Sequence, residues 1–133
     1  MKNKIDHIGI VVKSIDDALK FYNGLLGITP AGEEILEDRG LRVCFIEIGD
    51  TRIELLQPTR EDSEVSKFLE KKGEGLHHVA YEVENVKEAI EKAKEIGLKP
   101  LSDEPKPGAH NTSVVFMHPK TTNGVLTELL QHN

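Results

Sequence analysis

Apolar and polar positions along this chain follow two periods, an alternation in short runs and a spacing of three to four residues in longer ones. The run HIGIVV at 7–12 is rich in β-branched residues and predicts a strand. Ser14, with Asp17 three residues later, is a helix-start signal, and Gly27 suits the left-handed residue at a helix end. The pattern therefore predicts a helix over about 15–26. Its apolar stripe is Ile15, Ala18, Leu19, Tyr22, Leu25 and Leu26.

The second half of the chain shows the same order of elements. LHHVAY at 76–81 predicts a strand, and Asn85 followed by Glu88 predicts the start of a helix that Gly97 ends. We expect the apolar positions of this helix to face the core. They are Val86, Ala89, Ile90, Ala93 and Ile96.

Two further segments complete the pattern. VCFIEI and TRIELLQ, joined by Gly49 and Asp50, predict a β-hairpin over 43–57. The stretch 61–74 predicts a short linker helix that ends at Gly73, and its inward residues are Val65, Phe68 and Leu69.

These elements form an internal repeat. With an offset of 71 residues, His7 aligns with His78 and Phe45 with Phe116, and a three-residue insertion then aligns the two ELLQ words at 54–57 and 128–131. We therefore expect one domain over 1–133. It consists of module 1 (about 1–60), the linker helix (about 61–74) and module 2 (about 75–133).

Each module contains several strands but only one long helix, which is too little to bury a sheet alone. The two modules must share one α+β structure, and similar units usually associate about an approximate two-fold axis. Matching residues should then meet near the centre.

Four matching polar residues lie within apolar strands: His7, Glu54, His78 and Glu128. A divalent cation is the simplest partner for two buried imidazoles and two buried carboxylates, and this donor set suits cobalt, nickel, zinc or manganese. The alternative is that these four side chains are solvated or paired with one another. His77 points to the opposite side of its strand, and we assign it to packing or to hydrogen bonding behind the ligands.

Composition narrows the functional classes. The net charge of −6 argues against binding of nucleic acid as a main role. Cys44 is the only cysteine, and the chain contains no apolar run long enough to cross a membrane. No membrane association is expected, and the cytoplasm is the expected location.

Together, DHIGI, LHHVAY and the terminal VLTELLQ resemble the vicinal oxygen chelate superfamily, in which paired βαβββ modules form a half-open, curved, eight-stranded sheet. Within it, GAH, FMHPK and GVL are similar to words of the methylmalonyl-CoA epimerase family. The resemblance implies epimerisation of (R)- and (S)-methylmalonyl-CoA by α-proton abstraction, an acyl-CoA substrate and a homodimer. It places His7, Glu54, His78 and Glu128 at metal-ligand positions and implies cobalt or a similar divalent ion.

Our hypothesis for the chemistry is that Glu54 and Glu128 also act as base and acid. One departure from the family matters, because a glutamate proposed as a base in a bacterial epimerase corresponds to Val43 here. Glu47 is more simply a cross-strand partner of Arg52. Candidate substrate-binding residues are His110, Asn111, His118 and Lys120.

Two other functions remain open from the sequence. Glyoxalase I, a lactoylglutathione lyase, uses the same four-ligand set and also moves a proton. A non-catalytic ligand-binding protein of the same architecture is the second alternative, although such proteins often lose the ligands. An extradiol dioxygenase fits less well, since that class typically uses two histidines and one carboxylate.

Overall fold

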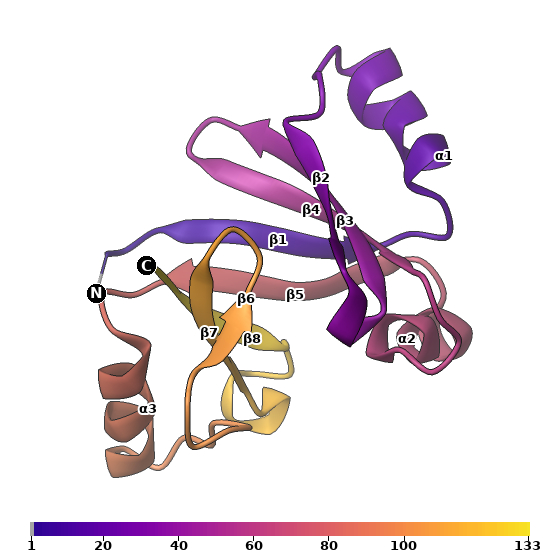
Figure 1. Ribbon diagram of the computed structural model, residues 1–133. Helices are drawn as coiled ribbons and strands as arrows, with labels where there is room; N and C mark the ends of the chain where they lie inside the picture. The colour runs from indigo at the N-terminus through magenta and orange to yellow at the C-terminus, as the bar shows by residue number, and fades with distance from the viewer. Residues whose placement is uncertain (1) are drawn as a thin grey trace. The chain divides into compact units, whose positions relative to one another are not determined.

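The computed structural model describes residues 2–133, which form eight strands and three α-helices (Figure 1). The strands are β1 (Ile5–Val11), β2 (Gly32–Leu36), β3 (Leu41–Ile48), β4 (Thr51–Pro58), β5 (Gly75–Glu82), β6 (Lys106–Gly108), β7 (Thr112–Met117) and β8 (Thr127–His132). The helices are α1 (Ile15–Leu19), α2 (Glu64–Lys72) and α3 (Val86–Glu95), with a π-helix η1 (Lys20–Leu25) and two 3₁₀ turns, η2 (Glu37–Arg39) and η3 (Pro119–Thr121). The element order β1-α1-β2-β3-β4 and β5-α3-β6-β7-β8 confirms the predicted α+β class with two βαβββ modules.

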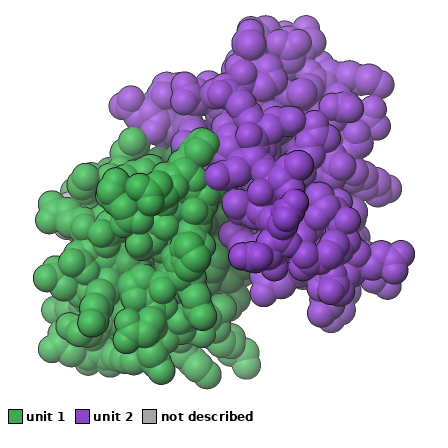
Figure 2. Space-filling view, in the orientation of Figure 1, with its two compact units in different colours: residues 1–7, 78–133 green, residues 8–77 purple. Residues whose placement is uncertain are grey.

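The chain divides into two compact units, which Figure 2 colours separately. Unit 1 contains residues 2–7 and 78–133, and unit 2 contains residues 8–77. Within unit 2 the strands follow the order β2-β3-β4-β1, and within unit 1 the order β5-β8-β7-β6. The start of β1, which includes His7, thus belongs to the same unit as most of the second module.

The repeated ELLQ word has the same structural role in both units. Gln57 accepts a hydrogen bond from the backbone N–H of Ile15 at 2.8 Å, and Gln131 accepts one from the backbone N–H of Val86 at 2.9 Å. Each glutamine therefore satisfies a free N–H at the start of its unit's helix. The side chains of Ser14 and Asn85 cap the same two helices, as predicted.

Each helix covers one face of its unit's strands, and the glutamate of each ELLQ word lies on the other face. In unit 2, Ile15 packs with Cys44 and Leu55. In unit 1, Ile90 packs with Val115 and Leu129. Since neighbouring strand residues point to opposite faces, Glu54 and Glu128 project away from the helices.

The first helix differs from its prediction. Only Ile15–Leu19 is α-helical, and Lys20–Leu25 is wound as a π-helix in which Leu26 donates to the Phe21 carbonyl at 3.0 Å. Asn23 and Gly24 are weak α-helix formers, and the Asn23 side chain donates to the Ile28 carbonyl at 3.0 Å.

The widened turn rotates the end of the apolar stripe away from the core. Leu25 and Leu26, predicted to be buried, are 73% and 48% exposed. Ile96 is likewise exposed because α3 ends at Glu95, before the last position of its predicted stripe.

The hairpin and the linker helix are confirmed. Gly49 and Asp50 form the turn between β3 and β4, whose register places Glu47 opposite Arg52. Ser63 caps α2 and Gly73 ends it. His77 packs its ring on Phe68 of α2, with centroids 5.0 Å apart, which agrees with a packing role.

Across residues 2–133, none of the helices has the length and apolar character needed to traverse a lipid bilayer.

Gly40 is the position where unit 2 depends most on glycine. Its φ is +65°, and a methyl group there would lie 2.9 Å from Cβ of Ser63 and 3.0 Å from Cζ of Arg60. Gly40→Ala should lower the free energy of unfolding by about 2–3 kcal/mol, because strain and a clash add. Urea unfolding measures the loss.

Gly27→Ala is the matched control. Gly27 also has a positive φ, but a methyl group there would meet no atom within 4 Å. Its loss should be about 1 kcal/mol, and equal losses for the two variants would contradict the role given to the contact at Gly40.

Candidate metal centre

Three strands of unit 1 bring His7, His78 and Glu128 together. His7 lies on the start of β1, His78 on β5 and Glu128 on β8. All three side chains are buried, and Glu128 is 5% exposed. Phe116 of β7 lies opposite Glu128. Its ring packs edge to face on the His78 ring, with the ring centroids 5.5 Å apart, and restricts the orientation of the imidazole.

The donor atoms of this group form a nearly equilateral triangle. Nε2 of His7 lies 3.1 Å from Oε1 of Glu128 and 3.1 Å from Nε2 of His78, and the remaining side, from His78 to Glu128, is 3.0 Å. Two donors at right angles on an ion with bonds of about 2.1 Å lie about 3.0 Å apart. The group can therefore hold a divalent metal on one triangular face and leave other coordination positions open.

Asp6 fixes the orientation of the His7 ring. Its Oδ2 atom lies 2.7 Å from Nδ1 of His7, and its Oδ1 atom lies 2.7 Å from Nε2 of His132. An ionised carboxylate only accepts hydrogen bonds, so Nδ1 of His7 donates to Asp6 and the Nε2 atom is turned toward Glu128. This carboxylate–histidine arrangement is the one commonly found behind metal-bound histidines, and it fits the metal.

Asp6 is not among the predicted site residues. Neighbouring residues of a strand point to opposite faces of the sheet, so the alternation rule predicts that the side chains of Asp6 and His7 do not meet. Its position directly before the first histidine was the only signal in the sequence, and it is a weak one.

The electrostatics of Glu128 also favour a cation. Burial alone would raise the pKa of this carboxyl, but hydrogen bonds and charge from His7 and His78 outweigh it and lower the pKa to about 2. Glu128 is therefore ionised at neutral pH and is a strong ligand but a weak base.

Glu54, the fourth predicted ligand, belongs to unit 2. It is buried on β4 directly opposite Phe45, just as Glu128 lies opposite Phe116. Its Oε2 atom accepts a bond of 3.5 Å from Arg52, whose guanidinium lies over the Phe45 ring at 5.3 Å. Ligation by Glu54 stays a prediction.

The predicted substrate-binding residues lie on two loops of unit 1. His110 and Asn111 form the tip of the β6–β7 hairpin, both with φ of +55°. His118 caps η3 by accepting a bond from the Lys120 N–H at 3.1 Å, and the Lys120 side chain is exposed. Contact of these four residues with a substrate stays a prediction.

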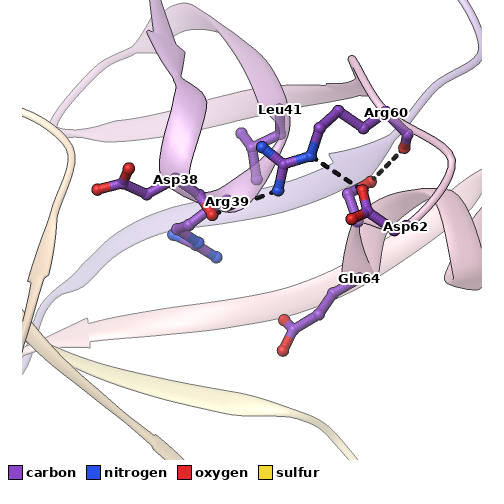
Figure 3. A pocket seen from close by; sticks show the side chains of 7 residues that line it. Asp38, Arg39, Leu41, Arg60, Asp62 and Glu64 are labelled. Atoms are coloured by element: carbon purple, nitrogen blue, oxygen red, sulfur yellow. Dashed lines mark hydrogen bonds and ion pairs between the residues drawn. The ribbon is translucent and has the colours of Figure 1, made fainter.

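A hollow of about 210 Å³ in unit 2 has different chemistry (Figure 3). Arg60 crosses it and donates to the carbonyl of Glu37, to the carbonyl of Asp38 and to the Asp62 carboxylate. The guanidinium is thus engaged by the protein, and the rest of the lining is of mixed character: Asp38, Arg39, Leu41, Ser63 and Glu64. None of these lining residues is a histidine, unlike those of the metal centre.

Comparison with known proteins defines the class. Residues 6–116 match the family model of the Glyoxalase/Bleomycin resistance protein/Dioxygenase superfamily. The chain belongs to this superfamily, as its paired βαβββ modules and its histidine–glutamate group lead one to expect.

Within the superfamily, the chain is similar along its whole length to methylmalonyl-CoA epimerases. It is 41% identical to the ethylmalonyl-CoA/methylmalonyl-CoA epimerase of Cereibacter sphaeroides, over 98% of this chain and 99% of that one. A structure of a Streptomyces coelicolor methylmalonyl-CoA epimerase variant with 2-nitronate-propionyl-CoA superimposes with a TM-score of 0.91, at 38% identity over 96% of this chain and 93% of the other. A hypothetical protein from Bacillus halodurans superimposes with a TM-score of 0.97 at 45% identity, over 100% of this chain and 96% of that chain.

The low pKa of Glu128 predicts how the stability of the metal-free protein depends on pH. The folded-state pKa of about 2 is below the ordinary value of 4.5. Ionised Glu128 therefore stabilises the folded state above pH 4.5, and this stabilisation is lost as the pH falls toward 2. Glu128→Gln should remove up to about 3 kcal/mol of this pH dependence. Urea unfolding of both proteins between pH 5 and about 2 tests this, and identical slopes would contradict it.

The Asp6 contact predicts a loss of metal affinity in Asp6→Asn. Removal of the charged partner of a ligating histidine typically costs 10–100-fold in affinity, so we expect a loss of about that size for Co²⁺ or Zn²⁺ in competition with a chelator.

Glu82→Gln is the matched control for Asp6→Asn. Glu82 is a buried carboxylate of the same unit, and it is paired with Lys2 at 2.9 Å and Lys4 at 3.8 Å. Its replacement should leave the affinity nearly unchanged. Equal effects of the two substitutions would refute the role of Asp6.

Proposed function

We propose that this protein is a metal-dependent epimerase that interconverts (R)- and (S)-methylmalonyl-CoA by removing and returning the α-proton. The observation that carries this proposal is the triangle of His7, His78 and Glu128 donor atoms, with sides of 3.0–3.1 Å, in a chain similar over its whole length to epimerases of this kind. Cobalt is the metal we propose first, with nickel, zinc and manganese as alternatives, because two imidazoles and carboxylates suit all four.

A divalent ion bound at this group would act as a Lewis acid toward the carboxylate and thioester oxygens of the substrate. The chain's own residues supply the site for it. His7, held by Asp6, and His78, held by Phe116, turn their Nε2 atoms toward one another and toward Glu128 in a buried position. Because the rings are fixed before ligands arrive, little reorganisation is needed on binding.

Proton transfer is the second requirement. Inversion at the α-carbon needs one group to take the proton and another to return it on the opposite side. Glu54 and Glu128 are the proposed pair. The pKa of about 2 suits Glu128 better to holding the cation than to taking a proton. Glu54, which accepts a bond of 3.5 Å from Arg52, is therefore the proposed base of the two.

The remaining features of the proposal follow from the likeness to epimerases. The proposed substrate is an acyl-CoA. It is contacted by two loops, the hairpin tip at His110 and Asn111 and the turn at His118 and Lys120. Two copies of the chain form a homodimer. The proposed location is the cytoplasm.

The assay is exchange of the α-proton of methylmalonyl-CoA in deuterated water, using protein reconstituted with cobalt. We expect exchange and interconversion of the two epimers. Turnover of a glutathione hemithioacetal instead would indicate a glyoxalase I-type lyase, and metal or ligand binding without either reaction would indicate a non-catalytic protein. Both results would contradict the proposal.

Glu128→Gln should reduce the rate of α-proton exchange by about 100-fold or more, with an unchanged fold by circular dichroism. The reason is that an amide is a poorer ligand than a carboxylate and cannot act as a base. Glu47→Gln on the exposed end of β3 is the control and should keep the wild-type rate. Near wild-type exchange in Glu128→Gln would remove this residue from the chemistry.

A further inference from the structure

β2 carries a carboxylate that its surroundings do not explain. Glu34 lies directly opposite Val43 of β3, and Val43 lies opposite Leu56 of β4. Residues opposite one another in antiparallel strands share a face, so Glu34 lies in a row with two side chains that are 1% and 4% exposed. Its Oε2 atom is buried and, alone among such side-chain atoms in residues 2–133, has no hydrogen-bond partner.

An acceptor buried without a partner opposes folding, because it has lost water and gained nothing in return. Such a group in a natural protein calls for an explanation, and a catalytic role is one of the common ones. The neighbouring Glu33 shows the ordinary alternative. It is exposed and accepts two bonds from Arg42, at 2.7 and 2.9 Å.

Glu34 shares its face with Glu54. The next row on the same face consists of Gly32, Phe45 and Glu54, which pair across β2, β3 and β4. Glu34 and Glu54 are separated by two inter-strand spacings across the sheet and by two residues along the strands. Their backbones therefore lie about 12 Å apart. Gly32 adds no side chain at the β2 end of that row.

The face between them is otherwise apolar. Leu41, Val43, Phe45 and Leu56 are all buried on it. Two carboxyl groups approaching across such a surface can flank one carbon of a small acyl group, and the apolar floor excludes water from the reacting atoms.

We propose that Glu34 is a proton-transfer residue of the epimerisation and works opposite Glu54, in the second role that Glu128 would otherwise fill, so that Glu128 serves as a ligand alone. This inference rests on the proposed function and deepens it. One of the two carboxylates takes the α-proton, and the C–H electron pair passes into the enolate of the thioester. The carboxyl of the other then donates its proton to the opposite face of the same carbon. The two groups thereby exchange roles, and the next turnover starts from the opposite epimer or after exchange with solvent.

The test uses the separate epimers of methylmalonyl-CoA in deuterated water with cobalt-loaded protein. Glu34→Gln should slow interconversion by about 100-fold or more. It should still exchange the α-proton of one epimer with retention, because Glu54 can take and return a proton on its own side. Glu33→Gln, the neighbouring control, should keep both reactions.

Stability gives a readout that does not depend on activity. Glu34→Leu removes a buried acceptor without a partner and should raise Tm, whereas Glu33→Leu breaks the Arg42 ion pair and should not. A lower Tm for Glu34→Leu than for the wild type would overturn the proposal.

The possible failures can be told apart. Wild-type interconversion by Glu34→Gln would overturn this inference and leave the proposed function standing. A wild-type protein that exchanges no α-proton with any divalent metal would overturn the proposed function and this inference with it.

Discussion

The candidate metal centre depends on one close contact between three donor atoms. Nε2 of His7, Nε2 of His78 and Oε1 of Glu128 lie 3.0–3.1 Å from one another, and the charge on Glu128 must be compensated there. Lone pairs this close in a buried place repel one another unless a proton or a cation lies between them. In the metal-free protein, hydrogen bonds and charge from His7 and His78 outweigh the effect of burial and lower the pKa of Glu128 to about 2. A divalent ion does the same with more charge, so protons and metal compete for one position.

The scaffold around this group is assembled from a repeated set of contacts. In each unit the glutamine of ELLQ holds the start of a helix, a leucine packs under that helix, and the glutamate projects to the opposite face. In each ELLQ segment, the residues that hold the helix and the glutamate of the candidate site are therefore adjacent in sequence. This arrangement fixes the position of each glutamate, because the following leucine and glutamine of the same strand contact the helix of its unit.

Much of this could be predicted from the sequence, because both the fold and the site follow from the repeat. Helix caps at Ser14 and Asn85, the hairpin at Gly49 and the convergence of His7 with His78 all come from matched positions or from local signals. Features without a counterpart in the other copy were harder to find. The π-helix arises from Asn23 and Gly24 in the first copy, and it turns apolar side chains outward that a regular helix would bury. Glu34 has no matched carboxylate, since Lys106 holds the equivalent position, opposite Val114 as Glu34 is opposite Val43.

The most direct measurement of the central claim is metal content combined with X-ray absorption of the cobalt-loaded protein. We predict one tightly held divalent ion per chain, surrounded by nitrogen and oxygen donors that include two imidazoles. His78→Ala should lose one imidazole and most of the bound ion. A wild-type protein that retains no divalent ion, or one whose bound ion is unaffected by His78→Ala, would contradict the account.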